Sequence, residues 1–469
     1  MRAAAGRDRG EALTAWRGGV LYTGGDGWTP VTGHTIFTED GRILAILPSL
    51  CDNARTLERK TPAERMHDLQ GRYMMPGLIN LHVHLNSGGR PAKKKMKPGD
   101  YIRLVHLASS NPVLKEAALR LTASHAKTLL MSGVTTIRTM GGIADLDTRI
   151  RDRILAGRLT GPRVLACNTG ISVPGGHVAG SLAYPARSVS EAVDCVDRIA
   201  SESTDLVKLM ITGGIMDAER RGEPGALKMP PEMVRAACDR AHHHGLPVAA
   251  HVESPAGMIA ALENGVDTIE HGALCPTGPE APGMSADGEA VRTNARIMEL
   301  FHETGASLVT TLSPVVPLSG LDPAFTHMRE MDRYNSRVVL DGIAACARQC
   351  LEEGIPVGLG TDTGCPYVTQ YDTWRELAYF HSFLEVTEQK ALETATAGNA
   401  RIAGIYDRTG SLEPGKSADL LILGRDPVRD LTALRDPEAV VARGILYDRP
   451  EIRRYPEIDT QLDTLYRKE

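Results

Sequence analysis

Two histidines separated by a single residue, His82 and His84, are the first feature of this chain that suggests chemistry. They end an apolar run that begins at Leu78, which is the pattern of a strand buried on both faces. Side chains repeat every second residue along a strand, so both imidazoles point to the same side. Two imidazoles aimed at one point from a rigid strand suit a divalent metal ion, provided that further ligands lie nearby.

Further residues of metal-binding or acid–base type stand inside or directly after later apolar runs. Lys208 interrupts the run from Leu206 to Ile211, and a lysine buried in a strand costs several kcal/mol unless it has a partner or a function. Three more residues of this kind stand at the ends of later apolar runs or within two residues of them: His251, His271 and Asp362. Histidine and aspartate side chains are suitable metal ligands, so these residues fit a metal site if the fold brings the strand ends together.

The arrangement of apolar runs predicts such a fold. Eight short runs alternate with amphipathic stretches that predict helices, which is typical of an α/β protein with a (β/α)8 TIM barrel. In this barrel the carboxyl ends of the strands meet at one rim, and functional side chains stand there. The predicted strands are Leu78–His84, Thr135–Thr139, Arg163–Cys167, Leu206–Ile211, Pro247–His251, Thr268–His271, Ser307–Thr311 and Pro356–Gly360.

Both ends of the chain have a different pattern, with short strands separated by glycine and aspartate turns. We therefore predict a small discontinuous β-sandwich domain built from residues 1–74 and 410–469. Residues 75–409 form the predicted hydrolase barrel. A chain of 469 residues is long enough for a large barrel and a second module.

The composition of the chain indicates which binding partners and which cellular compartment to expect. The net charge of −5 argues against nucleic acid, because phosphate binding needs a basic surface. No apolar stretch approaches the ~20 residues that span a bilayer, so we expect no membrane partner. Residues 1–19 are polar and lack the apolar core of a secretory signal. The eight cysteines show no CxxC pair, which favours reduced thiols and a cytoplasmic protein.

The ordered set of strand-end residues resembles the amidohydrolase superfamily. Pro76-Gly77-Leu78-Ile79 before the histidine pair matches that family, as does the segment from Glu413 to Leu423, the usual return into the β-sandwich. Val207-Lys208-Leu209-Met210, followed by Thr212-Gly213-Gly214, resembles the branch of imidazolonepropionase-like proteins and Xaa-Pro and Xaa-Arg dipeptidases. The resemblance covers nearly the whole chain.

The resemblance implies two divalent metal ions, with Zn²⁺ the expected metal. By the family pattern His82, His84 and Asp362 hold one ion, and His251 and His271 hold the other. Lys208 is N-carboxylated in that branch, and the carbamate bridges the two ions. Asp362 has a second, catalytic role, because it takes a proton from the bridging hydroxide and passes it to the leaving amine.

Residues near the expected metals are candidates for substrate contacts. Family members carry a Gly-Gly-His where this chain has Gly175-Gly176-His177, so we expect His177 to donate a hydrogen bond to the developing oxyanion. Arg138, Glu253 and Tyr367 are candidate substrate-binding residues. The basic loop from Arg90 to Lys97 is either a carboxylate-binding element or an ordinary solvated loop.

Two departures from the family leave the substrate open. Val178-Ala179 stands where dipeptidase-like members commonly have Gly-Asp, and His251-Val252-Glu253-Ser254 stands where many relatives have His-Ala-His-Gly. The predicted function is hydrolysis of an amide or amide-like C–N bond in a small molecule, such as an N-acyl amino acid, a dipeptide or a related carboxamide. We expect a homo-oligomer, as is common among relatives.

Other functions remain open at this point. The same nucleophile serves esters, lactones, carbamates, ureas and phosphotriesters. A mononuclear deaminase is a weaker alternative, because deaminases of the family lack the lysine and carry a glutamate at the position of Ser254. A non-catalytic scaffold is the weakest, because such proteins lose metal ligands and the full set of six is present here.

Overall fold

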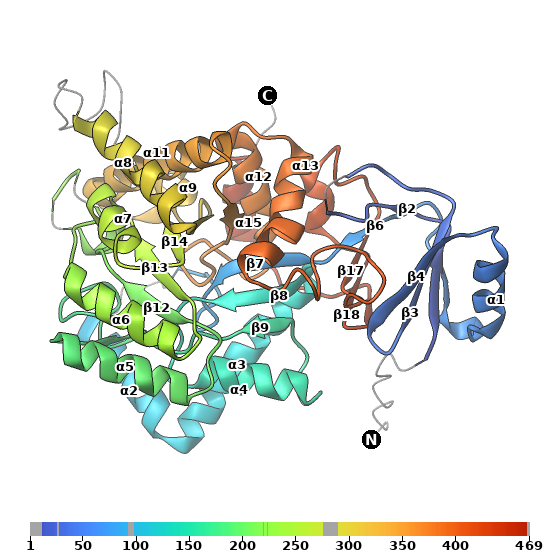
Figure 1. Cartoon of the computed structure of the whole chain (residues 1–469), viewed down its shortest axis with the longest axis horizontal. Helices are drawn as coiled ribbons and strands as arrows, with labels where there is room; N and C mark the ends of the chain where they lie inside the picture. The colour runs from blue at the N-terminus through green and yellow to red at the C-terminus, as the bar shows by residue number, and fades with distance from the viewer. Residues whose placement is uncertain are drawn as a thin grey trace. The chain divides into compact units, whose positions relative to one another are not determined.

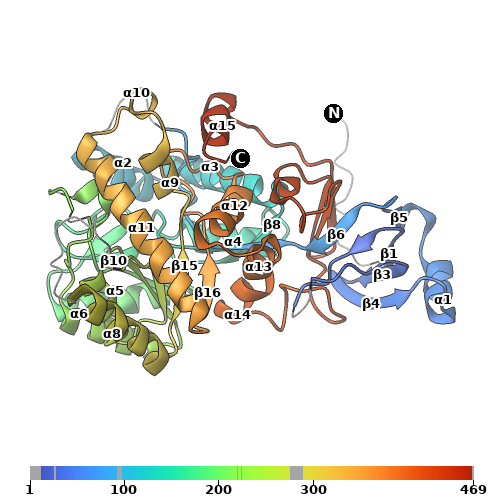
Figure 2. The same cartoon turned by 90° about the horizontal axis from the view of Figure 1, so that it is seen from above.

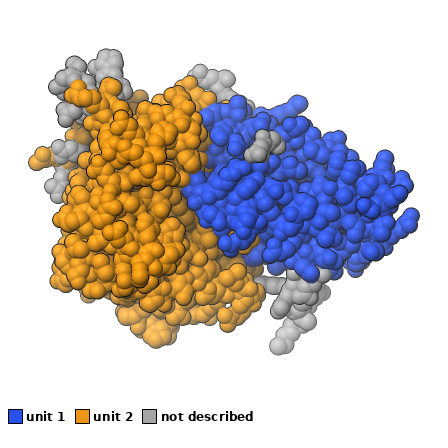
Figure 3. Space-filling model, in the orientation of Figure 1, with its two compact units in different colours: residues 1–79, 128–136, 386–453 blue, residues 80–127, 137–385, 454–469 orange. Residues whose placement is uncertain are grey.

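The computed structural model describes residues 12–25, 28–91, 98–218, 220–222, 224–274 and 289–466. It divides into two compact units, each drawn from three stretches of chain and coloured separately in Figure 3. One unit comprises residues 1–79, 128–136 and 386–453, and the other comprises residues 80–127, 137–385 and 454–469. The second unit carries every residue of the candidate site.

The first unit contains two β-sheets. One has the strand order β4-β3-β1-β5 and the other has the order β19-β18-β17-β6-β2. Strand β17 pairs antiparallel with β6, with Leu421 opposite Met75, so distant parts of the chain share one sheet. The bounds are β1 (Thr14–Arg17), β2 (Val20–Leu21), β3 (His34–Glu39), β4 (Arg42–Pro48), β5 (Met66–Asp68), β6 (Tyr73–Pro76), β17 (Leu420–Leu423), β18 (Ala439–Ala442) and β19 (Ile445–Asp448).

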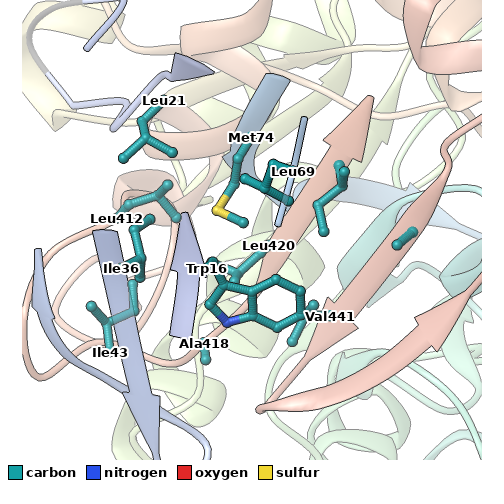
Figure 4. Close-up of a cluster of buried hydrophobic side chains, with 12 residues drawn as sticks. Trp16, Leu21, Ile36, Ile43, Leu69, Met74, Leu412, Ala418, Leu420 and Val441 are labelled. Carbon is teal, nitrogen blue, oxygen red and sulfur yellow. The ribbon is translucent and has the colours of Figure 1, made fainter. Parts of the chain in front are cut away.

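Apolar side chains from both sheets form one core in this unit. Figure 4 shows Trp16 of β1, Met74 of β6 and Leu420 of β17 in the same cluster, and all three are buried. Burying such side chains is the dominant favourable term in folding, so neither terminal segment completes the core alone. The predicted β-sandwich is confirmed as part of the fold, but this unit differs from the predicted bounds of 1–74 and 410–469. It also includes residues 75–79, 128–136 and 386–409, whereas residues 454–469 belong to the other unit.

Eight parallel strands form the barrel, and every predicted strand is present. Parallel pairing runs without interruption from β12 through β13, β14 and β15 to β16, and β7, β8 and β9 form the adjoining sheet. Figure 1 labels most of them. The bounds are β7 (Leu78–Val83), β8 (Val134–Thr139), β9 (Arg163–Leu165), β12 (Val207–Met210), β13 (Val248–Val252), β14 (Thr268–His271), β15 (Ser307–Thr310) and β16 (Val357–Leu359).

Two short strands, β10 (Gly170–Ser172) and β11 (Ala183–Pro185), were not predicted. They lie between β9 and β12 in the chain, and Ile171 of β10 pairs with Leu209 of β12. Three residues are too few to give a readable alternation of apolar and polar side chains. These strands extend the barrel sheet beside β12, and the residues that connect them include His177.

Helices cover the strands, and local residues define where several begin. Ser188 and Ser254 accept a hydrogen bond from the backbone at the starts of α5 and α7. Helix α11 packs along β15 and β16 (Figure 2). No helix within the described ranges has both the length and the apolar character needed to cross a bilayer. The bounds are α1 (Asp52–Lys60), α2 (Pro98–Ser110), α3 (Pro112–Met131), α4 (Leu146–Leu155), α5 (Val189–Ser201), α6 (Pro231–His243), α7 (Pro255–Leu262), α8 (Glu289–Thr304), α9 (Val315–Gly320), α10 (Pro323–Thr326), α11 (Glu330–Glu352), α12 (Thr373–Leu384), α13 (Glu388–Glu393), α14 (Asn399–Ile402) and α15 (Pro456–Asp463).

The barrel closes where the end of β16 meets β7, and this closure leaves no room for a side chain at Gly360. A Cβ atom there would lie 2.3 Å from the Cβ of His82 and 2.5 Å from its backbone nitrogen. Gly360→Ala therefore forces two strands apart, and we expect it to lower the free energy of unfolding by about 1–3 kcal/mol. Urea unfolding followed by circular dichroism measures the loss.

Gly99 in α2 provides the matched control, because a Cβ there meets no heavy atom within 4 Å. Gly99→Ala should be neutral or slightly stabilising, since alanine favours a helix over glycine by up to ~1 kcal/mol. Equal stability of the Gly360→Ala variant and the wild-type protein would contradict the tight closure.

Candidate metal centre

The six predicted metal ligands lie together at the carboxyl ends of the barrel strands. They line one cavity of about 160 Å³ in the second unit, and they come from five different strands or strand ends. The six are His82, His84, Lys208, His251, His271 and Asp362. The convergence that the sequence could only predict is thus present in the structure.

One group of donors surrounds the carboxylate of Asp362. Its Oδ1 lies 3.1 Å from His84 Nε2 and 3.4 Å from His82 Nε2. His84 is oriented by its other ring nitrogen, because Nδ1 donates to the carbonyl of Gly141 at 2.8 Å. Donor atoms of His82, His271 and Asp362 all lie within 4.8 Å of one another, close enough to share one ion.

A second group consists of His251, Glu253 and His271, whose donor atoms also lie within 4.8 Å of one another. The rings of His251 and His271 have centroids 4.6 Å apart. His271 Nδ1 is 2.5 Å from Thr311 Oγ1, which orients the ring. His271 therefore belongs to both groups, whereas the family pattern assigns it to one ion only.

Lys208 lies among these donors with no partner of its own. Its side chain is 1% exposed, and Nζ makes no hydrogen bond with any described residue. Burial lowers the pKa of this amine to about 8. An isolated ammonium is expensive to bury, so the position fits a group that is modified or meets another ligand. Together with the two donor groups, this orphaned nitrogen makes the residues compatible with two divalent ions and a bridging carbamate.

The electrostatic state of three of the imidazoles also suits metal binding. Burial lowers the pKa of His82 to about 4, and burial holds the pKa values of His251 and His271 well below their usual range. These imidazoles are therefore neutral at pH 7, which is the form that binds a metal. Burial alone would raise the pKa of Asp362, but the neighbouring His82 and His84 hold it well below its usual range.

The backbone is strained at two of the ligands. His271 has φ of 71° and Asp362 has φ of 55°, both in the left-handed region that non-glycine residues rarely adopt. Such a conformation costs of order 1–3 kcal/mol and is found where the surrounding structure imposes it, often at functional sites. At both positions the strain turns a side chain at the end of a strand into the cavity.

Glu270 orients His82, and the sequence did not indicate this role. The carboxylate is fully buried and accepts hydrogen bonds from His82 Nδ1 at 2.8 Å and from an Arg138 guanidinium nitrogen at 2.7 Å. Burial opposes ionisation, but Arg138 and His82 lower the pKa of Glu270 to about 2. A carboxylate behind a ligating histidine fixes its tautomer and direction. The sequence signal for this pair was that Arg138 and Glu270, with opposite charges, each stand inside a predicted apolar strand.

Arg138 consequently has a different position from the one expected. Its nitrogens donate to Glu270, to the carbonyl of Leu81 at 2.8 Å and to Thr268 Oγ1 at 3.2 Å. The side chain is buried in the barrel and is not among the residues that line the cavity. Arg138 therefore donates its hydrogen bonds to groups inside the barrel and not to a substrate carboxylate in the cavity.

Neither Tyr367 nor Arg90 of the basic loop lines the cavity. Tyr367 is buried in an apolar cluster with Leu318 and Ile458 and does not line the cavity. In the basic loop, Arg90 forms an ion pair with Glu457 at 3.1 Å. Lys93, Lys94, Lys95 and Lys97 of that loop lie outside the described residues.

His177 lies at the cavity wall, beside the ligands. Its ring stacks on His251 with centroids 4.2 Å apart, and Nδ1 lies 2.5 Å from Asp217 Oδ2. Asp217 also accepts a hydrogen bond from the backbone of Gly214. Gly214 must remain small, because a Cβ there would lie 2.9 Å from His177 Cε1. The histidine is thus held on three sides, and Asp217 is a partner that the sequence did not reveal.

Removing the charge of Glu270 tests the buried ion pair. Glu270→Gln leaves Arg138 buried without its counter-charge, so we expect a loss of about 3–5 kcal/mol in the free energy of unfolding. Urea unfolding measures it. The control is Glu263→Gln, since Glu263 is a half-exposed carboxylate 3.6 Å from Arg296. An exposed pair contributes about 0–1 kcal/mol, and equally small losses in both variants would contradict the assigned role.

Known proteins match this chain over almost its whole length. The model of the Amidohydrolase family matches residues 73–446. A solved structure from Bifidobacterium longum, to which prolidase activity is ascribed, is 34% identical, with a TM-score of 0.79 over 97% of this chain and 100% of its own. A Xaa-Pro dipeptidase with methionine in its active site is 25% identical, with a TM-score of 0.74 over 93% and 100% of the two chains.

Ochratoxinase from Aspergillus niger is 25% identical over 454 residues, which represent 90% of this chain and 84% of the relative. Imidazolonepropionase from Mesorhizobium japonicum is 25% identical over 87% of this chain and 91% of its own. The resemblance inferred from the motifs is confirmed. The chain belongs to the amidohydrolase family, in the branch that includes Xaa-Pro dipeptidases, ochratoxinase and imidazolonepropionase, and it is a metal-dependent hydrolase acting on carbon–nitrogen bonds.

Proposed function

We propose that the protein is a binuclear hydrolase that cleaves an amide or amide-like C–N bond in a small molecule. The substrate classes that we propose are N-acyl amino acids, dipeptides and related carboxamides. The observation that carries the proposal is the pair of donor groups that share His271 and lie beside the unpartnered Nζ of Lys208. The similarity to a Xaa-Pro dipeptidase and to ochratoxinase supports the type of bond.

We further propose Zn²⁺ as the metal, because the donors are imidazoles and carboxylates. His82, His84 and Asp362 would hold one ion, His251 and His271 the other, and N-carboxylated Lys208 would join them. When bound, two such ions supply an activated water molecule and polarise the carbonyl of the substrate.

The chain's own residues then have separate tasks. Asp362 is ionised and touches the imidazoles of His82 and His84, so its carboxylate can take a proton from the attacking water. It would deliver that proton to the leaving nitrogen, which must be neutral to depart as an amine. His177 would donate through Nε2 to the oxygen that becomes negative, because Nδ1 is already engaged by Asp217.

The cavity walls favour a small substrate with an apolar part. Met140, Leu182 and Met210 line the cavity together with the metal ligands. A volume of about 160 Å³ accommodates a small group next to the reacting carbonyl. Apolar walls of this kind bind by excluding water from an aliphatic or aromatic side chain.

Metal content and turnover test the proposal directly. The purified protein should contain close to two transition-metal ions per chain and should hydrolyse members of a panel of N-acyl amino acids, dipeptides and carbamates. Lys208→Ala removes the bridging group, so we expect a lower metal content and no turnover. Lys127→Ala, an exposed lysine in α3, is the control and should match the wild-type protein. One ion per chain, unchanged by added bicarbonate, would contradict the bridging carbamate.

The role of His177 has a separate test. His177→Asn should lower kcat by about 10²–10³, the effect of removing one oxyanion donor, while the metal content stays unchanged. His244→Asn is a matched control, because His244 forms a similar pair with Asp197, at 2.6 Å, on the surface. A His177→Asn variant with wild-type kcat, measured on the same substrate, would exclude His177 from catalysis.

A further inference from the structure

Glu253 extends the second donor group, and its place in the sequence repeats the spacing of the first. His251-Val252-Glu253 ends β13 just as His82-Val83-His84 ends β7, with two potential ligands separated by one residue. Along a strand this spacing sends both side chains to the same face. In the structure a carboxylate oxygen of Glu253 lies within 4.8 Å of donor nitrogens of both His251 and His271.

The carboxylate of Glu253 has no compensating charge in the described protein. The residue is 8% exposed, and its Oε2 accepts no hydrogen bond from any described residue. The charged groups that act on it electrostatically are Asp362 and Asp217, which are themselves acidic. The Ile215 backbone N–H donates to the carboxylate. Such an arrangement of acidic groups is unfavourable unless a cation lies among them.

The position of Glu253 is fixed by the surrounding backbone. Its backbone nitrogen donates to Thr212 Oγ1 at 3.1 Å. The chain at Gly225 passes so close that a Cβ there would lie 2.3 Å from the carbonyl oxygen of Glu253. The backbone of the residue is therefore held in place, and a ligand role would not require a loop to move.

We propose that Glu253 is a further protein ligand of the second metal ion, beside His251, His271 and the bridging carbamate of Lys208. This inference rests on the proposed binuclear function. Imidazoles and a glutamate carboxylate occur together as ligands of catalytic zinc. With Asp362 on the first ion and Glu253 on the second, each divalent ion is paired with one carboxylate.

A substrate cation is a poorer explanation for the unpaired carboxylate. Both imidazoles of the set line the cavity, but Glu253 does not. A group entering the cavity therefore meets His251 and His271 first, whereas an ion held between the imidazoles can also reach the carboxylate. The donor set consequently selects a compact divalent cation rather than an ammonium or guanidinium group of a substrate.

Disabling one donor group at a time allows the affinity for each ion to be measured separately. His82→Asn disables the first donor group, and in that background we expect one Zn²⁺ per chain, held by the second group. Adding Glu253→Gln to this variant should lower its affinity for the remaining Zn²⁺ by at least about 10-fold, as measured by Zn²⁺ titration of the chelator-treated protein. In the His251→Asn background, where the remaining ion occupies the first group, Glu253→Gln should leave the affinity unchanged.

Folding and metal binding are separated by thermal unfolding without metal. Glu253→Gln removes a buried carboxylate that lacks a partner, so the Tm of the metal-free protein should not fall. The rise in Tm produced by Zn²⁺ should be smaller than in the wild-type protein. Asp217→Asn is the control, because Asp217 is a neighbouring carboxylate outside the donor set, and its Zn²⁺ affinity should equal that of the wild-type protein.

The possible outcomes are distinct. An unchanged affinity for both ions in the Glu253→Gln variant would overturn the ligand role, and lost turnover with both ions still tightly bound would also overturn it. In either case the proposed function stands if the wild-type protein binds two ions and hydrolyses the panel. A wild-type protein that binds no metal would instead overturn the proposed function itself.

Discussion

The hydrogen bonds that close the barrel are the constraint on which the candidate site depends. The backbone nitrogens of Thr361 and Asp362 both donate to the carbonyl of His82, at 3.2 Å and 2.8 Å. They join the first and last strands and place the carboxylate of Asp362 against the two histidines. Gly360 permits the approach, and the left-handed backbone of Asp362 turns its side chain inward. A site built on such closely packed strands is held in place before any ligand binds.

Buried charges in the barrel fall into two kinds, and the difference separates structural roles from functional ones. Arg138, Glu270 and His82 form a chain in which the ionised groups have hydrogen-bonding partners. Lys208 and Glu253 are also buried, but each has an atom without a partner among the described residues. A protein tolerates such unpaired atoms where another species completes the bonding. Both lie beside the donor groups, which is why we assign them to metal binding.

The sequence was sufficient to predict the strands and the residues at their ends, because both follow from local periodicity. It could not reveal Glu270 as the partner of His82. Regular alternation places Glu270 and His271 on opposite faces of β14, and only the left-handed φ of His271 brings both to His82. It could not reveal Asp217 either, because this residue lies 40 positions from His177 and the pair forms only in the fold. Tyr367 was misleading for the same reason, since its proximity to Asp362 in sequence does not bring it to the cavity.

This contrast explains why the reaction class is easier to infer than the substrate. The bond-breaking groups stand on strands, whose geometry is regular and whose ends meet at one rim. The groups that would select a substrate come from connections between strands, such as His177 and Leu182 between β9 and β12. Glu253 lies at the boundary between a strand and a connection, one residue beyond the end of β13. A change of residue at such a boundary can alter the electrostatics of the metal centre without changing the barrel, which is how one scaffold acquires different hydrolytic specificities.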